Sequence, residues 1–213
     1  MACSRSRAEA AIPPQLTEKV RIGGQFSLWP SFLIEWTEHL RTERPQLAMT
    51  LVAGSANRLN HDLGAGLIDL AILYKPQLGP LLEAREIFTD RLMLVRSANL
   101  GRWQDGWVDI DWGEELRMQV AALVDLACGA GVRLDLGGLA IRWLEECEGS
   151  GYVPEYLAKE ALACGRLIAV DDMPTFDFPI LAVWHTNQSP LAEPLVESLG
   201  QFMSASSAAR TER

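Results

Sequence analysis

The chain has 213 residues, of which 48% are hydrophobic and 22% charged, and 19 basic against 28 acidic side chains give a formal net charge of −9. This composition is typical of a soluble globular protein and excludes a disordered chain. Phosphate contacts need clustered Lys and Arg, and no such cluster is present, so the chain is not expected to wrap nucleic acid by itself. Any contact with DNA is expected outside these residues.

The ends and the cysteines place the protein in a reducing compartment. No stretch is apolar over the length of a membrane span, and the charged first residues lack the apolar core of a signal peptide. We therefore expect a cytoplasmic protein. The four cysteines, which form no C-x-x-C pair and have no His at ligand spacing, predict reduced thiols and no metal site, with zinc or a disulfide as the alternative; they are Cys3, Cys128, Cys147 and Cys164.

The stretch from Val20 to Lys75 predicts a parallel β-α-β-α-β unit. Its first strand ends on two glycines, and Pro30 then suits the first turn of a helix because its missing N–H would be unpaired there anyway. The next strand, Leu47–Ala53, alternates as a half-buried strand does, whereas Leu67–Tyr74 is almost continuously apolar, as expected for a strand covered on both faces. This is the first half of a ligand-binding α/β domain.

Downstream, strands and helices alternate again and predict a second lobe of the same design. The predicted strands are Glu83–Phe88, Arg91–Arg96, Trp107–Trp112, Val132–Leu136, Leu167–Val170 and Phe178–His185. One predicted helix begins at Gly113, and three others span Leu139–Glu146, Glu155–Cys164 and Pro190–Phe202. The residues from Ser204 onward are expected to be frayed. Two lobes built on one chain of this length can bury a sizeable core.

Three segments of the first lobe resemble the effector-binding domain of LysR-type transcriptional regulators. They are the sequence IGGQFSLWPSFL from Ile22 to Leu33, LVAGS from Leu51 to Ser55, and GLIDLAI from Gly66 to Ile72, which is the most specific of the three. The resemblance covers roughly residues 18 to 203. It is only partial at Gly149–Pro154, where proline follows Tyr-Val directly, and no winged helix-turn-helix is present in the chain.

The resemblance implies an α/β fold of two Rossmann-like lobes joined by two crossing strands, like a type 2 periplasmic binding protein. The expected boundaries are residues 18–91 and 174–206 for the first lobe and residues 92–173 for the second. Hinges are expected near Asp90–Met93 and Asp171–Pro174. Residues 1–17 are either a leader or the end of a linker helix, and residues 207–213 are a tail.

In open α/β sheets, ligands bind outside the carboxyl ends of the strands, and helix N-termini there favour anions. We therefore expect a cleft between the lobes that is lined by loop residues of both. From the first lobe these are Gln25, Phe26, Ser27, Leu28, Trp29, Gly54, Ser55 and Tyr74. From the second lobe they are Trp112, Gly137, Gly138, Ser150, Gly151 and Tyr152.

Several of these residues have a simpler structural alternative. Ser27 and Ser55 can act as helix caps, a role worth about 1 kcal/mol, and Trp29 and Trp112 can belong to the core or to a lid. The resemblance implies that the serines at these two positions contact an effector carboxylate. The aromatic residues and the scarcity of cations in the cleft suggest a small, partly apolar effector with at most one carboxylate.

The resemblance also implies a homodimer or tetramer, in which first lobes pair through the helix Ser31–Arg44 and the strand Leu47–Ala53. The interface candidates on these elements are Phe32, Ile34, Trp36 and Leu51, with core packing as the alternative for each. DNA would be contacted only through a winged helix-turn-helix outside this chain.

The function predicted from the sequence is therefore a ligand-sensing regulatory domain, without a cofactor and without a membrane partner. No G-x-S-x-G, H-E-x-x-H or dinucleotide-binding glycine motif follows a predicted strand, so an enzyme is not expected. A solute-binding protein of a transport system, built on the same two-lobe plan, is the alternative. A transferase on this scaffold is a third reading, which lacks a catalytic set of residues.

Overall fold

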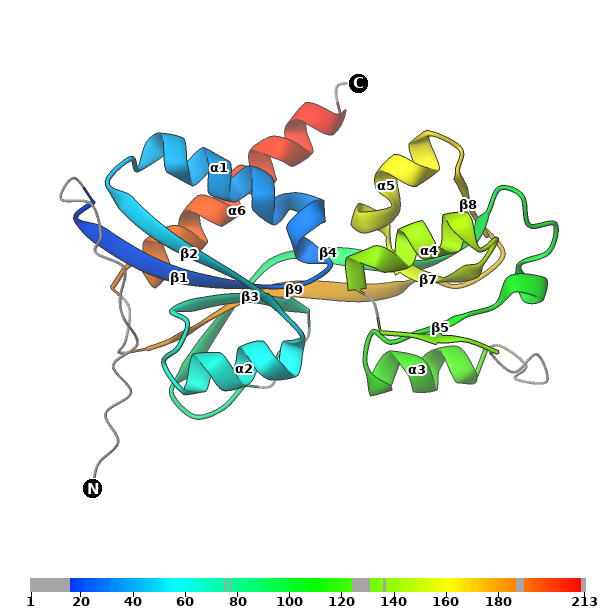
Figure 1. The fold of residues 1–213 in the computed structure, drawn as a ribbon, viewed down its shortest axis with the longest axis horizontal. Helices are drawn as coiled ribbons and strands as arrows, with labels where there is room; N and C mark the ends of the chain where they lie inside the picture. The colour runs from blue at the N-terminus through cyan, green and yellow to red at the C-terminus, as the bar shows by residue number, and fades with distance from the viewer. Residues whose placement is uncertain are drawn as a thin grey trace.

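The computed structural model describes residues 16–74, 76, 78–123, 131–135, 137–186 and 190–211. Figure 1 shows two groups of helices and strands side by side, joined by the long strands β4 (Leu82–Ser97) and β9 (Phe176–His185). The prediction of two α/β lobes joined by two crossing strands is confirmed. Most of the expected leader, Cys3, Lys75, Cys128 and the end of the tail lie outside the described residues.

The first lobe is built on three parallel strands. They are β1 (Glu18–Gln25), β2 (Leu47–Gly54) and β3 (Leu70–Tyr74), and β1 lies between the other two. The helices of this lobe are η1 (Trp29–Leu33), α1 (Ile34–Glu43), α2 (Ala56–Gly64) and α6 (Ala192–Thr211). Helices α1 and α6 cover one face of the sheet and α2 covers the other (Figure 1).

The continuous apolar run in β3 follows from this sandwich, because successive side chains of a strand point to opposite faces. Leu70 and Ile72 belong to the main core, whereas Ala71 and Leu73 pack in a smaller core beneath α2. Both faces of β3 are therefore buried. An acidic residue just before the strand has a different role: the Asp69 carboxylate accepts hydrogen bonds from Arg21 N at 2.7 Å and from Arg21 Nη2 at 2.6 Å, which fixes β3 against β1.

The second lobe continues the same sheet, whose strand order is β2-β1-β3-β9-β4-β7, with β8 also paired to β4. Its strands β7 (Ser150–Pro154) and β8 (Leu167–Ala169) belong to this sheet, whereas β5 (Asp109–Ile110) and β6 (Arg133–Leu134) form a separate two-stranded parallel sheet. Its helices are η2 (Trp103–Gly106), α3 (Glu114–Ala121), η4 (Gly137–Leu139), α4 (Ala140–Glu146) and α5 (Glu155–Ala163). In Figure 1, α4 and α5 lie on one side of this lobe and α3 lies on the other.

Two expectations differ from the structure. The predicted strands Glu83–Phe88 and Arg91–Arg96 are one continuous strand, β4, because its ladder with β9 runs from Leu82 to Leu92 and is only shifted in register between Glu86 and Phe88. The last helix does not end at Phe202 but continues to Thr211. No glycine or proline follows Gly200, and the Ser204 hydroxyl donates to the Gly200 carbonyl within the helix, so nothing there breaks it.

Within the described ranges, no helix combines the length and the apolar content needed to cross a bilayer. In the same residues, no three His, Cys, Asp or Glu side chains come together as a metal site. The described cysteines, Cys147 and Cys164, are free thiols at the surface.

Candidate functional site

The loop after β1 holds five of the predicted ligand residues, and the structure gives them different roles. Phe26 is 51% exposed, whereas Leu28 is fully buried in the main core, so the Leu28 side chain does not face a ligand. The side-chain oxygen of Gln25 accepts a hydrogen bond from the Tyr74 amide at 3.1 Å. Trp29 donates through its indole N–H to the Gly24 carbonyl at 3.0 Å.

Ser27 is the unusual member of this loop. Its side chain is fully buried, and its hydroxyl oxygen has no hydrogen-bond partner among the described residues. It does not cap the helix, because the residue at the N-cap of η1 is Leu28 and no side-chain capping bond is present there. An unpaired buried hydroxyl is unfavourable by about 1–3 kcal/mol, and none of the described residues offsets this cost at Ser27.

Two glycines of the second lobe close over this loop. A Cβ atom added at Gly137 would lie 3.0 Å from Phe26 Cβ, and one added at Gly138 would lie 3.1 Å from Pro30 Cγ and 3.5 Å from Ser27 Cα. Gly137 also has a φ of +52°, which disfavours any other residue. The structure thus brings together Phe26, Ser27 and the pair Gly137–Gly138, as the sequence predicts.

The loop after β2 is placed differently. Ser55 is exposed and its hydroxyl accepts a hydrogen bond from the Arg58 amide at 3.4 Å, so it caps α2, which was the alternative for this residue. Gly54 lies against Leu59, where an added Cβ would be 3.1 Å from Leu59 Cγ. Both residues therefore have structural partners within the first lobe.

Aromatic rings continue from the first lobe into the second. Tyr74 stacks on Phe178 with ring centroids 4.1 Å apart, and Trp112 meets Phe178 edge-on at 6.2 Å. The Trp112 indole donates to the Tyr152 carbonyl at 2.7 Å, and the Tyr152 hydroxyl donates to the Pro174 carbonyl at 3.0 Å. Burial raises the pKa of Tyr152 to about 12. These aromatic side chains are buried and pack against one another between the lobes, as core residues do.

Ser150 and Gly151 lie inside β7 and are buried. The Ser150 hydroxyl donates to the Trp103 carbonyl, and a Cβ atom on Gly151 would come within 2.9 Å of Ile110 Cδ1. Both residues therefore have structural partners within the second lobe.

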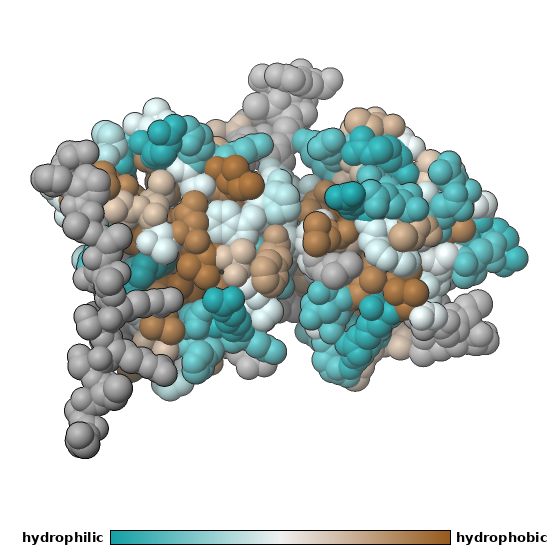
Figure 2. Space-filling view, viewed as in Figure 1, coloured by the Kyte–Doolittle hydropathy of each residue, from teal (hydrophilic) through white to brown (hydrophobic). Residues whose placement is uncertain are grey.

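The four interface candidates divide equally. Phe32 and Trp36 are buried in the main core, so core packing, the alternative for these two, is what the structure shows. Ile34 and Leu51 are 60% and 45% exposed. Leu51 belongs to β2, which is the edge strand of the sheet. Figure 2 shows apolar surface over this lobe and a hollow between the two lobes on the same face.

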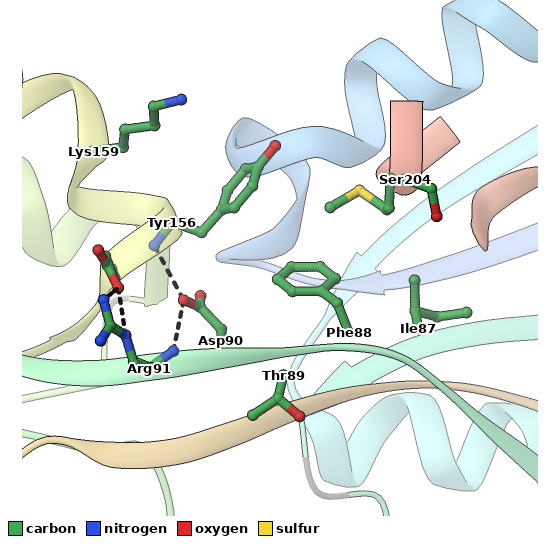
Figure 3. Close-up of a pocket in the computed structure, with 10 residues that line it drawn as sticks. Ile87, Phe88, Thr89, Asp90, Arg91, Tyr156, Lys159 and Ser204 are labelled. Carbon is green, nitrogen blue, oxygen red and sulfur yellow. Dashed lines mark hydrogen bonds and ion pairs between the residues drawn. The ribbon is translucent and has the colours of Figure 1, made fainter. Parts of the chain in front are cut away.

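A second concave site was not predicted from the sequence. It is a pocket of about 500 Å³ between β4, the start of α5 and α6 (Figure 3), and none of its lining residues belongs to the predicted ligand set. It is lined by Ile87, Phe88, Thr89, Asp90, Arg91, Glu155, Tyr156, Lys159, Met203 and Ser204. The sequence contains one signal that could have indicated this pocket. Asp90 lies within a strand, where Asp is uncommon.

Asp90 is the buried charge of this pocket. It is 5% exposed, and its carboxylate accepts hydrogen bonds from the amides of Arg91 at 2.8 Å and Tyr156 at 3.2 Å. The Tyr74 hydroxyl donates to its other oxygen at 3.4 Å. Burial raises the pKa of Asp90 to about 6 against the opposing effect of the amide hydrogen bonds, and burial together with Asp90 raises the pKa of Tyr74.

Comparisons with known proteins agree with this architecture. The regulatory domain of HypT from Salmonella typhimurium, in its bromide-bound form, is similar with a TM-score of 0.72 and 16% identity, covering 92% of this chain and 100% of that one. A variant of the OxyR2 regulatory domain from Vibrio vulnificus gives a TM-score of 0.71 and 16% identity, covering 91% and 99%. The reduced OxyR regulatory domain from Pseudomonas aeruginosa gives 0.68 and 17%, covering 88% and 99%. No curated protein matches the chain by sequence.

These structural neighbours are too distant in sequence to show more than the fold, which is that of type 2 periplasmic binding proteins. The family assignment comes from the sequence family model for the LysR substrate binding domain, which matches residues 14–204. The chain therefore belongs to the LysR substrate binding domain family, the regulatory domain of LysR-type transcriptional regulators.

Proposed function

We propose that this domain senses a small-molecule effector bound between its lobes, where the loop after β1 meets Gly137–Gly138. The unpaired, fully buried hydroxyl of Ser27 carries this proposal. A ligand oxygen at this position would give the hydroxyl the hydrogen-bond partner that it lacks among the described residues.

The helix that follows Ser27 favours an effector with an acidic group. η1 and α1 form one helical segment from Trp29 to Glu43. The first N–H groups of a helix and its dipole attract anions, so a carboxylate near Ser27 would meet donors as well as the hydroxyl. Phe26, half exposed at the same loop, offers an apolar surface next to this group. A small, partly apolar monocarboxylate fits both features.

Effector binding here would act on the arrangement of the lobes. The site is made from both lobes, so a ligand that contacts both binds one arrangement more tightly and shifts the population toward it. We propose that this change is passed to a homodimer partner through the exposed side chains of Ile34 and Leu51, and to DNA through a winged helix-turn-helix outside this chain.

A thermal-shift screen of small metabolites, followed by calorimetry on the hits, tests the site. A ligand present at 100 times its dissociation constant adds about 2.7 kcal/mol of stability, which such a screen detects. Ser27→Ala should weaken binding of an authentic effector by about tenfold, because one hydrogen bond in a dry site is lost. Ser31→Ala is the matched control: it removes a hydroxyl one turn away that donates to the Ser27 carbonyl at 2.7 Å. Equal affinities for wild type and Ser27→Ala would remove Ser27 from the effector site.

A further inference from the structure

The pocket at the crossing strands has the make-up of a ligand site, with an apolar wall on one side and a buried charge beneath it. Two aromatic rings pack edge to face against Phe32, whose ring centroid lies 5.6 Å from that of Phe88 and 5.8 Å from that of Tyr156. The rings of Phe88 and Tyr156 are tilted against each other, with centroids 5.7 Å apart. In Figure 3, the rings of Phe88 and Tyr156 border the open space, and Asp90 lies below Tyr156. The volume of about 500 Å³ suits a molecule the size of an amino acid.

The Asp90 carboxylate is hydrogen-bonded by the chain, but no cation of the described residues neutralises its charge. Its hydrogen-bond donors are two backbone amides and a phenol, all of them uncharged. No ion pair to Asp90 is formed by any cation in the described ranges. The guanidinium of Arg91, its neighbour on β4, is held by Glu155 at 2.7 Å instead. A buried carboxylate without a counter-ion is costly, and a bound cation would reduce that cost.

The other charged and titratable groups around Asp90 carry both signs of charge. They are Tyr74 from β3, Arg91 from β4, and Glu155, Tyr156 and Lys159 from α5, whereas the lining residues of α6, Met203 and Ser204, are neutral. The Glu155 carboxylate adds to the rise in the pKa of Asp90, which is caused mainly by burial. The Arg91 guanidinium is paired with Glu155, so these two opposite charges offset each other. Lys159 is exposed, and its amine extends away from Asp90 in Figure 3.

We propose that this pocket binds a small organic cation, an amine with an apolar body, whose ammonium group pairs with Asp90 and lies against the faces of Phe88 and Tyr156. Buried carboxylates and aromatic faces both attract ammonium groups, the latter through the ring quadrupole. This site is separate from the effector site at Ser27 and does not rest on it.

The test is an NMR titration of the full 213-residue chain at about pH 8, where Asp90 is ionised, with three probes of one shape and different charge. The probes are benzylamine, benzyl alcohol and benzoate. Benzylamine should bind most tightly and should shift the backbone amides of Arg91 and Tyr156, which donate to Asp90. No binding of benzylamine, or benzoate binding at least as tightly as benzylamine, overturns the proposal.

Variants identify the counter-ion. Asp90→Asn keeps the shape and the acceptor for the two amides and should weaken benzylamine by about tenfold, while leaving benzyl alcohol unchanged. Asp105→Asn, which removes the same charge from the surface helix η2, is the control and should change neither probe. Phe88→Leu keeps an apolar wall without a ring and should weaken benzylamine more than benzyl alcohol. Unchanged benzylamine affinity in Asp90→Asn contradicts the assignment.

Lys159→Gln separates a cation site from an anion site. Removing this exposed amine at the pocket should strengthen benzylamine by about twofold, because a like charge is removed in screened solvent. A pocket for carboxylates would instead lose benzoate affinity and leave benzylamine unaffected, which would overturn the proposal. Lys19→Gln on β1 is the matched control for the loss of one exposed lysine and should change neither affinity.

Discussion

The surroundings of Ser27 and Asp90 both contain a buried polar group at the junction of the lobes, and they leave it incomplete in different ways. Among the described residues, the Ser27 hydroxyl has no hydrogen-bond partner, whereas the Asp90 carboxylate has three neutral donors and no paired cation. A neutral group needs only a hydrogen bond, and a charged group also needs an opposite charge. The two sites are therefore suited to different ligands, an acidic one at Ser27 and a basic one at Asp90.

The largest effect that we expect is the pH dependence of stability that Asp90 confers. Its pKa is raised from 3.8 to about 6 in the folded chain, so the folded state holds this proton more tightly than the unfolded state. The contribution of Asp90 is thus most favourable below about pH 4 and is lost as the pH rises through about 6, a change of about 3 kcal/mol.

Chemical denaturation at several pH values measures this effect as the difference between wild type and Asp90→Asn, in which the other carboxyl groups cancel. Wild type should lose about 2 kcal/mol relative to Asp90→Asn between about pH 4 and pH 7. A constant difference over this range would mean that Asp90 does not carry an uncompensated charge.

The contact that closes the loop of Ser27 should be next in size. Gly137→Ala forces a non-glycine residue to a φ of +52° and places a Cβ 3.0 Å from Phe26 Cβ. Gly165→Ala has the same backbone penalty at a φ of +69° with nothing within 4 Å, so it is the matched control. We expect losses in unfolding free energy of about 2–3 kcal/mol for Gly137→Ala and about 1–2 kcal/mol for Gly165→Ala. Equal losses would show that the lobes do not press together there.

The two serines should respond in opposite ways. Ser55→Ala removes a helix cap and should lower the unfolding free energy by about 0.5–1 kcal/mol. Ser27→Ala removes a hydroxyl that has no partner and should leave the stability of the unliganded chain unchanged or raise it by up to about 1 kcal/mol. Thermal unfolding of both variants measures this contrast. A clear loss of stability in Ser27→Ala would mean that the hydroxyl is satisfied in solution.

Substitutions of the exposed side chains of the first lobe should have the smallest effect on the unfolding free energy. Their effect on the association of the chains should be larger. Ile34→Asp and Leu51→Asp should change the unfolding free energy of the monomer by less than about 0.5 kcal/mol, because both residues are exposed. Each should shift a dimer toward monomer in sedimentation velocity. Met118→Asp, in α3 and 62% exposed, is the control and should leave the association state unchanged. Dissociation by all three variants would point away from a specific interface.

The sequence predicts the elements well wherever the signal is local. The continuous apolar run of β3 and the cap at Ser55 each depend on a few neighbouring residues, and both are found. The strand β2 is also found, but Leu51 and Ala53, expected on its buried side, are exposed. The sequence also assigns Ser27 and Gly137–Gly138 to loops of two facing lobes, and in the structure these loops lie against each other. The sequence does not predict which side chains of this loop are buried. Leu28 belongs to the core, and the neighbouring Ser27 is equally buried.

The pocket at Asp90 was missed because its walls come from distant parts of the chain. Asp90 and Tyr156 are 66 positions apart, and Met203 belongs to the last helix. The sequence predicted that α6 ends at Phe202 and that β4 is interrupted near Asp90. Both predictions left out residues that line this pocket. A continuous strand and a longer helix are tertiary outcomes, which local patterns do not determine.

The pairing of β4 with β9 determines how one lobe can rotate relative to the other. Ten residue pairs, from Leu82–His185 to Leu92–Phe176, join the two strands as they cross between the lobes, and the ladder is irregular only between Glu86 and Phe88. Rotating one lobe against the other then means twisting a hydrogen-bonded ribbon rather than turning about a loose joint, and such irregularities are where a ribbon twists most. The angle between the lobes at rest is therefore determined by the twist of this ribbon. The irregularity where the ribbon twists most lies next to the pocket that is lined by Phe88 and Asp90.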